Sequence, residues 1–192
     1  MTYESRRYAM VNRWDERHMK TVRRHLDPRP GERILEVGAG RGHLTKRLRD
    51  MGADAVGIDA NPHAADVAVT DSLVTMRAEN LDFADSSFDK VVSVHAIEHV
   101  PEIEGALSEI GRVLKPGGIA LLIYPAEPIQ GIWAVPTAVI LYGNPFKARQ
   151  VHCHWLWPAK MRRLTGGAGL REVHSEFNLL SSPQFVSVYA KV

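Results

Sequence analysis

The stretch ILEVGAGRGHL, residues 34–44, decides the fold. Its first four residues are a short run centred on apolar side chains, which predicts a buried strand. Gly38, Gly40 and Gly42 follow at alternate positions, and residues 43–51 then carry leucines at helical spacing. Glycine lets the backbone turn sharply and approach a ligand, while the first N–H groups of a helix lack partners within it. The stretch therefore predicts a strand, a ligand-binding turn and a helix in succession.

Outward from this stretch, strand and helix patterns alternate along residues 33–124. The run FDKVVSV (88–94) is rich in β-branched residues and predicts a buried strand. PEIEGALSEIGRVLKPGG (101–118) predicts a helix with one apolar face that is ended by Pro-Gly-Gly, and IALLIYP (119–125) predicts the next buried strand. Such alternation is typical of a parallel sheet with helices on both faces, so the predicted fold class is α/β.

The flanking segments complete the predicted organisation. WDERHMKTVRRHL (14–26) has apolar residues at helical spacing and is followed by two prolines, which predicts a helix. Residues 62–82 fit only a short helix and a weak strand, and the proline-bearing segment 125–150 is expected to be irregular. A helix near 158–168 precedes two strands, LREVHSEF and FVSVYAKV. We expect a single domain over residues 1–192, made of an N-terminal helical cap (1–29), a ligand-binding core (30–125), a covering insertion (126–157) and a C-terminal helix with strands (158–192).

Composition narrows the class of protein. A chain of 192 residues with 45% hydrophobic and 24% charged residues fits one globular domain with a full core. Cys153 is the only cysteine, so no intrachain disulfide is expected. The N-terminus lacks the apolar core of a signal peptide, and the longest apolar stretch, 129–143, is too short to cross a bilayer. These features predict a cytoplasmic protein without a transmembrane segment.

The charge balance bears on partners. A formal net charge of +2 is too small for a typical nucleic-acid-binding domain, so we expect no nucleic-acid partner. The first thirty residues carry more basic than acidic side chains. This run is interpreted as a solvated amphipathic helix, with attraction for an acidic substrate or a membrane surface as the alternative.

An acidic residue downstream adds to the evidence from the glycine loop. Asp59 ends the strand predicted by AVGID, where a carboxylate can accept hydrogen bonds from both hydroxyls of a ribose. A glycine loop and an acid at the end of the next strand form a much stronger signal together than either alone. They predict a site for a nucleoside-bearing ligand.

Two ligand classes fit such a site, dinucleotides and S-adenosylmethionine. The dinucleotide fingerprint has a third glycine where this chain has His43. Glu36 would also place negative charge beside a pyrophosphate, whereas it suits a ligand that carries a cation. These two residues argue against an oxidoreductase that uses a nucleotide cofactor.

At this point the sequence resembles the class I S-adenosylmethionine-dependent methyltransferases. The matching segments are ILEVGAGRGHLT, VGIDANP, AENLDFADSSFDKVVSVHAIEHV and VLKPGGIALLIYP, which together span roughly residues 30–125. The resemblance implies a Rossmann-like three-layer sandwich with a seven-stranded, mostly parallel sheet whose last strand is antiparallel. It also implies S-adenosyl-L-methionine as the cofactor.

The resemblance further implies a role for each matching residue. Glu36 and the loop of Gly38, Ala39, Gly40 and Gly42 would hold the methionine half of the cofactor, Asp59 the ribose and Ala60 the adenine, with Glu79, Asn80 and Leu81 flanking the adenine ring and His95 contacting the methionine portion through its backbone. One position departs from the family pattern, because Arg77 stands where similar proteins often carry an acid.

Two histidine motifs raise the question of a metal. SVHAIEHVPE (93–102) contains H-x-x-E-H, which matches a zinc-protease signature. His95 directly follows a predicted strand, so the motif straddles a strand end and a loop, whereas ligands four residues apart need one helical face. His-Cys-His at 152–154 is interpreted as a packing or substrate contact. We therefore expect no metal.

The predicted activity is methyl transfer to a small-molecule or lipid-like acceptor, at oxygen, by in-line displacement. His99 is the predicted proton acceptor, and bracing of the following helix is the alternative role for its ring. The alternative for the whole chain is a non-catalytic subunit that binds the cofactor or its product. Aromatic-rich segments are expected to select the acceptor: Tyr3, Tyr8, Trp14, Trp133, Tyr142, Phe146, His152, His154, Trp155 and Trp157.

Overall fold

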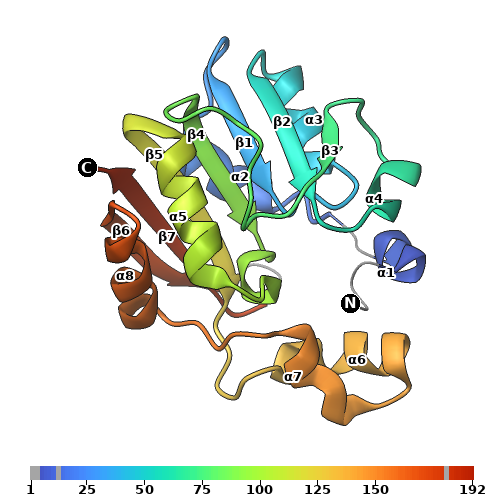
Figure 1. Ribbon diagram of the computed structural model, residues 1–192. Coiled ribbons are helices and arrows are strands. Elements are labelled where there is room, and N and C mark those ends of the chain that lie inside the picture. The colour runs from blue at the N-terminus through green and yellow to red at the C-terminus, as the bar shows by residue number, and fades with distance from the viewer. Residues whose placement is uncertain (1–4, 12–13, 180–181) are drawn as a thin grey trace.

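The computed structural model describes residues 5–11, 14–179 and 182–192 (Figure 1). Its centre is a seven-stranded sheet of order β3-β2-β1-β4-β5-β7-β6. The strands are β1 (Arg33–Val37), β2 (Asp54–Asp59), β3 (Leu73–Thr75), β4 (Phe88–Val94), β5 (Leu114–Pro125), β6 (Leu170–Asn178) and β7 (Gln184–Lys191).

The strand directions confirm the predicted sheet. Strands β1 to β5 pair in parallel, and β7 lies antiparallel between β5 and β6. The parallel strands all end at the same edge of the sheet. Strands β2 and β3 lie on one side of β1, and β4 and β5 lie on the other. The loops after β1, β2 and β4 therefore meet at this edge, where the strand order reverses.

Helices cover both faces of the sheet. They are α1 (Arg6–Val11), α2 (His18–His25), α3 (His43–Asp50), α4 (His63–Asp66), α5 (Ile103–Val113), α6 (Val135–Tyr142), α7 (Ala148–Val151) and α8 (Pro158–Gly167), with short 3₁₀ turns at Ile97–His99, Ile132–Ala134 and Pro145–Lys147. One core cluster joins the sheet to α5 and α8, and a second joins it to α2 and α3. The three layers are the ones the resemblance implied.

Two predicted helix boundaries differ from the structure. The helix expected at 14–26 begins at His18, because the preceding turn is held by the Asp15 carboxylate, which accepts the Arg17 N–H at 3.0 Å. The helix expected to reach residue 118 ends at Val113. Leu114 already pairs with Phe88, so β5 begins before the Pro-Gly-Gly segment.

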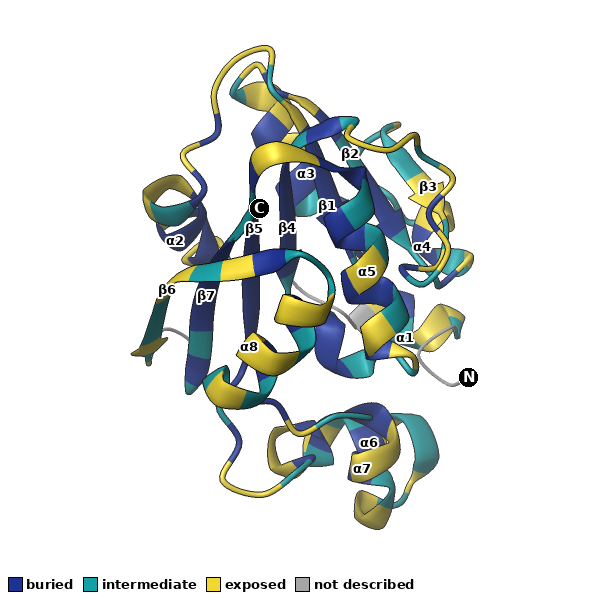
Figure 2. Ribbon diagram, turned by 60° about the vertical axis from the view of Figure 1, so that its left-hand side comes forward, coloured by how far each residue is buried: buried dark blue, intermediate teal, exposed yellow. Residues whose placement is uncertain are grey.

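The segment expected to be irregular contains two helices. Residues 126–157, called the lobe below, include α6 and α7 and lie beyond the carboxyl ends of the parallel strands (Figures 1 and 2). The lobe has its own small core of Ala134, Ala138, Ala148 and Val151. Within the described ranges, no helix is long and apolar enough to span a bilayer.

Candidate active site

The glycine loop between β1 and α3 is fixed by its neighbours. The N–H groups of Gly38 and Ala39 both donate to the carbonyl of Ile58, at 2.9 and 2.8 Å. The backbone of Gly38 has φ 76°, which favours glycine. A Cβ added there would lie 2.1 Å from the Cβ of Ala96, so the loop packs closely on the segment that follows β4. Glycine at this position therefore serves both turn and packing.

Asp59 is tied to the same loop. Its Oδ2 accepts the N–H of Gly40 at 2.7 Å, and its Oδ1 accepts the N–H of Asn61 at 2.8 Å. Burial raises the pKa of the Asp59 carboxyl, although these two N–H donors oppose the shift. Each carboxylate oxygen can accept further hydrogen bonds, so the group can still bind hydroxyls.

A first cavity opens beside Asp59. It is lined by Tyr8, Val37, Gly38, Ile58, Asp59, Ala60, Met76, Arg77, Ala78, Glu79, His95, Ala96, His99, Val100 and Pro101. Six of the cofactor-binding and catalytic residues expected from the sequence thus meet at one cavity: Gly38, Asp59, Ala60, Glu79, His95 and His99. The apolar and small side chains around Asp59 suit a flat ring next to a ribose.

Two residues expected near the adenine do not reach this cavity. Leu81 is buried in the core that joins the sheet to α5, and its N–H donates to the Glu109 carboxylate at 2.8 Å. Asn80 is also absent from the lining, whereas Glu79 lines the cavity and forms an ion pair with Arg77 at 3.1 Å. Asn80 is exposed and Leu81 is buried in the core, so residues 76–79 line this part of the cavity instead.

A second cavity also borders the glycine loop. It is lined by Tyr8, Trp14, Asp15, His18, Glu36, Gly38, Ala39, Arg41, His43, Val94, His95, Glu98, His99, Pro125, Trp133, His152 and Ser182. Tyr8, Gly38, His95 and His99 line both cavities. Gly40 and Gly42 line neither and act instead through the backbone turn, with φ 53° and 77°.

Glu36 contributes a buried carboxylate to the second cavity. Its Oε2 accepts hydrogen bonds from the backbone N–H and the hydroxyl of Thr45, in the first turn of α3. Burial raises the pKa of the Glu36 carboxyl to about 7, despite the opposing hydrogen bonds from Thr45. A cationic group placed beside Glu36 would favour its ionised form.

His95 occupies a strained backbone position where the two cavities meet. Its φ is 50°, which is uncommon for a residue other than glycine. Its Nε2 lies 2.7 Å from the Oε1 of Gln184, an atom that only accepts, so the ring donates to the amide. Gln184 Oε1 also lies 3.2 Å from Nε2 of His18. Sequence reasoning missed Gln184, which β7 brings to the site from far along the chain.

The ring of His99 is oriented by the lobe. Its Nδ1 lies 2.6 Å from the carbonyl oxygen of Val151, so Nδ1 carries the proton of the neutral ring. Its Nε2 then bears the lone pair and lies 4.0 Å from Oε1 of Glu98. Burial lowers the pKa of the His99 ring, which favours the neutral form.

Two buried carboxylates, neither assigned a role from the sequence, surround this ring. Glu98 is 1% exposed. Burial alone would raise the pKa of its carboxyl, but the rings of His95, His99 and His152 outweigh that effect and lower it to about 2. Glu127 accepts a hydrogen bond from Nδ1 of His152 at 2.8 Å. The side chains from the 3₁₀ turn Ile97–His99 and from the lobe thus form one cluster of titratable groups.

The H-x-x-E-H motif straddles a strand end and the segment that follows it, as the sequence predicted. His95 follows β4, and Ile97–His99 form a 3₁₀ turn, so H-x-x-E-H does not lie on one α-helix. Ligand-type atoms of Glu98, His99 and His152 nevertheless lie within 4.8 Å of one another. The absence of a metal therefore stays a prediction.

The aromatic residues expected to cover the site divide into groups. Tyr8, Trp14, Trp133 and His152 line the cavities described above. Trp155 and Trp157 line a third, shallower hollow that also includes Trp133. Tyr142, Phe146 and His154 line none of these cavities, and Tyr3 lies outside the described residues.

Comparison with known proteins identifies the family. Residues 35–122 match the family described as "Methyltransferase domain". An uncharacterized methyltransferase of Synechocystis sp. is 33% identical over 147 residues, which cover 70% of this chain and 69% of that protein. The chain belongs to the S-adenosylmethionine-dependent methyltransferase family.

Other members of the methyltransferase family match over shorter regions. The sterol 24-C-methyltransferase of Pneumocystis carinii is 35% identical over 114 residues, 54% of this chain and 30% of that protein. A ubiquinone biosynthesis O-methyltransferase of Azorhizobium caulinodans is 35% identical over 114 residues, 55% of this chain and 45% of that protein. The chain thus spans less than half the length of these two relatives.

The fold of this chain is also similar to that of solved methyltransferase structures, over nearly its whole length. The methyltransferase in complex with the Trm112 activator of Haloferax volcanii has a TM-score of 0.70 and 19% identity, and the match covers 97% of this chain and 96% of that one. The cofactor of the family is S-adenosylmethionine.

Proposed function

We propose that this chain transfers a methyl group from S-adenosylmethionine to a small-molecule or lipid-like acceptor, at oxygen, by in-line displacement. The observation that carries the proposal is the meeting of two cavities at Tyr8, Gly38, His95 and His99. One cavity has the features of a nucleoside site, and the other is ringed by histidines and aromatic side chains. A methyl group held at their junction would face an acceptor in the second cavity.

The residues present fit the cofactor at both ends. The Asp59 carboxylate faces the first cavity and can accept hydrogen bonds from ribose hydroxyls. The buried Glu36 carboxylate faces the second cavity, where it suits the ammonium group of the methionine half. When bound, the cofactor supplies an electrophilic methyl group, and the protein's part is to hold the acceptor in line with it.

We propose that His99 takes the proton from the acceptor hydroxyl. The Val151 carbonyl fixes the proton of the ring on Nδ1, so Nε2 is the basic nitrogen. Its lowered pKa keeps the ring neutral, which is the form a base requires. Glu98, 4.0 Å from Nε2, is placed to stabilise the ring once it is protonated.

The lining of the second cavity supports an apolar, ring-bearing acceptor. Trp14, Trp133 and Tyr8 offer flat apolar faces, while the histidines and Glu98 supply the polar groups that orient a hydroxyl. Relatives named for sterol and for ubiquinone biosynthesis agree with a lipid-like acceptor, and the second is named as an O-methyltransferase. A nucleic-acid acceptor is not part of the proposal.

Ligand-dependent thermal stability tests the cofactor assignment first. S-Adenosylhomocysteine should raise the melting temperature of the protein, whereas NAD should not, because only a ligand bound by the folded state stabilises it. An acceptor screen with methyl-labelled cofactor then tests the activity. Stabilisation by NAD alone would overturn the cofactor assignment. Cofactor binding without transfer to any phenol, quinol or sterol would favour a non-catalytic subunit.

A further inference from the structure

The lobe exposes an unusual amount of apolar surface. Most of the large hydrophobic side chains that the described residues leave exposed lie on it: Ile129, Ile132, Trp133, Val139, Ile140, Phe146, Trp155 and Trp157. Phe146 is 92% exposed. Large apolar side chains gathered on one exposed segment mark a site that another molecule covers.

Helix α6 accounts for much of this surface. Its sequence VPTAVILY has no charged side chain, and only Ala138 is buried. A helix that is apolar all round is ordinarily enclosed in a protein core or in lipid. Here it packs on one side against the small core of the lobe, and Val139 and Ile140 face outward.

Apart from the buried Glu127, the lobe itself carries no acidic side chain. No aspartate or glutamate occurs in residues 128–170, whereas Lys147 and Arg149 directly follow Phe146 and Ala148. The acid nearest in sequence, Glu127, is buried and accepts hydrogen bonds from His152 and from the N–H groups of Gly131 and Trp133. The exposed lobe is therefore apolar and cationic together.

The tryptophans sit where the lobe joins the domain. The indole N–H of Trp155 donates to the carbonyl of Glu127 at 2.7 Å, and that of Trp133 donates to the carbonyl of Ala126 at 3.2 Å. Both rings stay partly exposed, with their polar edges already bonded. Trp133 also lines the second cavity, which includes His99, and the third, shallower hollow. Apolar surface therefore continues from the lobe toward His99.

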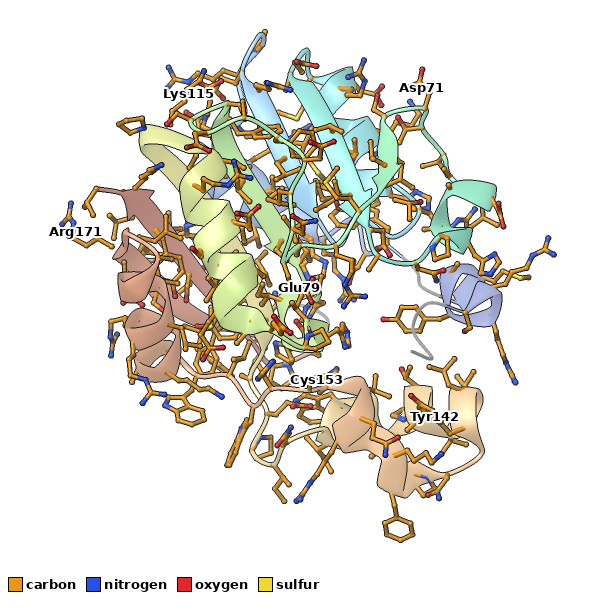
Figure 3. All side chains as sticks on the ribbon, in the orientation of Figure 1. Asp71, Glu79, Lys115, Tyr142, Cys153 and Arg171 are labelled. Carbon is orange, nitrogen blue, oxygen red and sulfur yellow. The ribbon has the colours of Figure 1, made fainter. Side chains whose placement is uncertain are left out.

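We propose that the lobe docks on an anionic lipid bilayer, with Phe146 and the outward face of α6 in the acyl boundary and Lys147 and Arg149 at the lipid phosphates. Apolar side chains flanked by cations are the features that bind a protein to the surface of such a membrane. The lobe lies at one end of the molecule, with Tyr142 on it, whereas Asp71 and Lys115 lie at the opposite end (Figure 3). A flat surface can therefore meet the lobe without displacing the sheet.

The same features distinguish a bilayer from RNA. Nucleic acid would gain from the cations and from stacking on aromatic rings, but not from exposed Val139 and Ile140. A bilayer covers both kinds of side chain. Docking would proceed whether or not methyl transfer occurs, so the inference does not rest on the proposed function.

Co-sedimentation with vesicles tests the proposal without measuring turnover. The protein should bind vesicles of mixed phosphatidylcholine and phosphatidylglycerol far more tightly than vesicles of pure phosphatidylcholine, and added salt should weaken the binding. Phe146→Ser should weaken it about 10-fold or more. Lys147→Gln combined with Arg149→Gln should weaken the binding about 30-fold, since each cation near an anionic surface contributes a factor of about 5 to the affinity.

Matched variants outside the lobe serve as controls. Val173→Ser removes an exposed apolar side chain from β6, and Lys20→Gln with Arg23→Gln removes two exposed cations from α2. These variants should bind vesicles as the unchanged protein does. Phe146 is so exposed that its loss should leave the melting temperature unchanged, which separates lost docking from lost folding.

Three outcomes would overturn the proposal. The first is equal binding, or none, to anionic and neutral vesicles. The second is a set of lobe variants that bind as the controls do. The third is a concentration-dependent dimer or a stable RNA complex that Phe146→Ser abolishes while vesicles go unbound, because the occupant of the lobe would then be a second copy or a nucleic acid.

Discussion

The Asp59 carboxylate accepts the N–H of Gly40 at 2.7 Å, so the two strongest signals in the sequence are joined directly in the structure. The bond fixes the loop after β1 against the end of β2. Both parts of the proposed nucleoside site are therefore held in place by the protein itself, and binding should require little rearrangement.

Replacing Asp59 with asparagine should weaken the binding of S-adenosylhomocysteine by about 10- to 100-fold, because hydrogen bonds to a charged acceptor are stronger than those to an amide. The one remaining side-chain oxygen can accept the Gly40 N–H, whereas the bond from the Asn61 N–H is lost, so the melting temperature of the variant is measured alongside. Isothermal calorimetry measures the effect, and the exposed Asp71→Asn is the control. Undiminished affinity in Asp59→Asn would remove the ribose role.

Glu36 should make stability depend on pH. Its carboxyl pKa is raised from 4.5 to about 7 in the folded protein, so the folded state holds a proton that the unfolded state releases. The free energy of unfolding should therefore fall as pH rises from about 4.5 to 7, by roughly 3 kcal/mol at most. Melting temperatures measured across this range should show the decline.

The variant Glu36→Gln should flatten that dependence and melt higher than the unchanged protein at pH 8, since its side chain carries no charge to bury. The amide oxygen can still accept both hydrogen bonds from Thr45. Affinity for the cofactor should fall at the same time, because the proposed partner of the methionine ammonium loses its charge. A variant that keeps full affinity would show that Glu36 serves only the fold.

Removing the ring of His99 should lower turnover by about 10²- to 10⁴-fold, the usual contribution of a positioned base. Binding of S-adenosylhomocysteine should persist, because Asp59 and Glu36 remain. Initial rates and calorimetry of His99→Ala measure the two effects separately, with the exposed His174→Ala as control. Turnover equal to that of the control would leave the ring a purely structural role.

The clustered ligand-type side chains allow a direct test for metal. We expect metal analysis of the purified protein to find no stoichiometric ion and a strong chelator to leave turnover unchanged. A bound ion that disappears in His152→Ala would instead show that Glu98, His99 and His152 form a metal site, since their ligand-type atoms lie within 4.8 Å of one another.

A methyl group at Gly38 should destabilise the domain by about 2–4 kcal/mol, because it combines an unfavourable backbone conformation with a close contact to Ala96. Chemical denaturation of Gly38→Ala gives the value. Combining it with Ala96→Gly should recover part of the loss, as the contact disappears while the backbone cost stays. If the loss of unfolding free energy in the double variant equals the sum of the losses in the two single variants, this packing explanation is refuted.

The parts of the fold that the sequence predicted well are those where local pattern and tertiary environment agree. The strand expected at 88–94 has those bounds in the structure, because a continuous run of β-branched residues suits a strand buried on both faces. Helix α6 was not foreseen: its uniformly apolar residues lack the periodicity that distinguishes a helix from other structure. The helix at 101–118 was drawn too long because pairing of Leu114 with Phe88 overrides the local signal.

The candidate site shows the same division. Glu36, Asp59 and the glycine loop could be found because each lies at the end of a strand, within a short motif that is continuous in the sequence. Gln184 and Glu127 could not, since only the order of strands in the sheet and the path of the lobe bring them near His95 and His152. Leu81 followed the motif in sequence, but its apolar side chain is buried in the core.

The position of Gln184 on β7 has a consequence for biosynthesis. A nascent chain that has emerged from the ribosome only as far as β5 already contains the glycine loop and Asp59, but it lacks the amide that orients the ring of His95. The side of the first cavity built by the glycine loop and Asp59 is thus encoded early in translation, whereas the contact that orients His95 is made only once β7 pairs with β5.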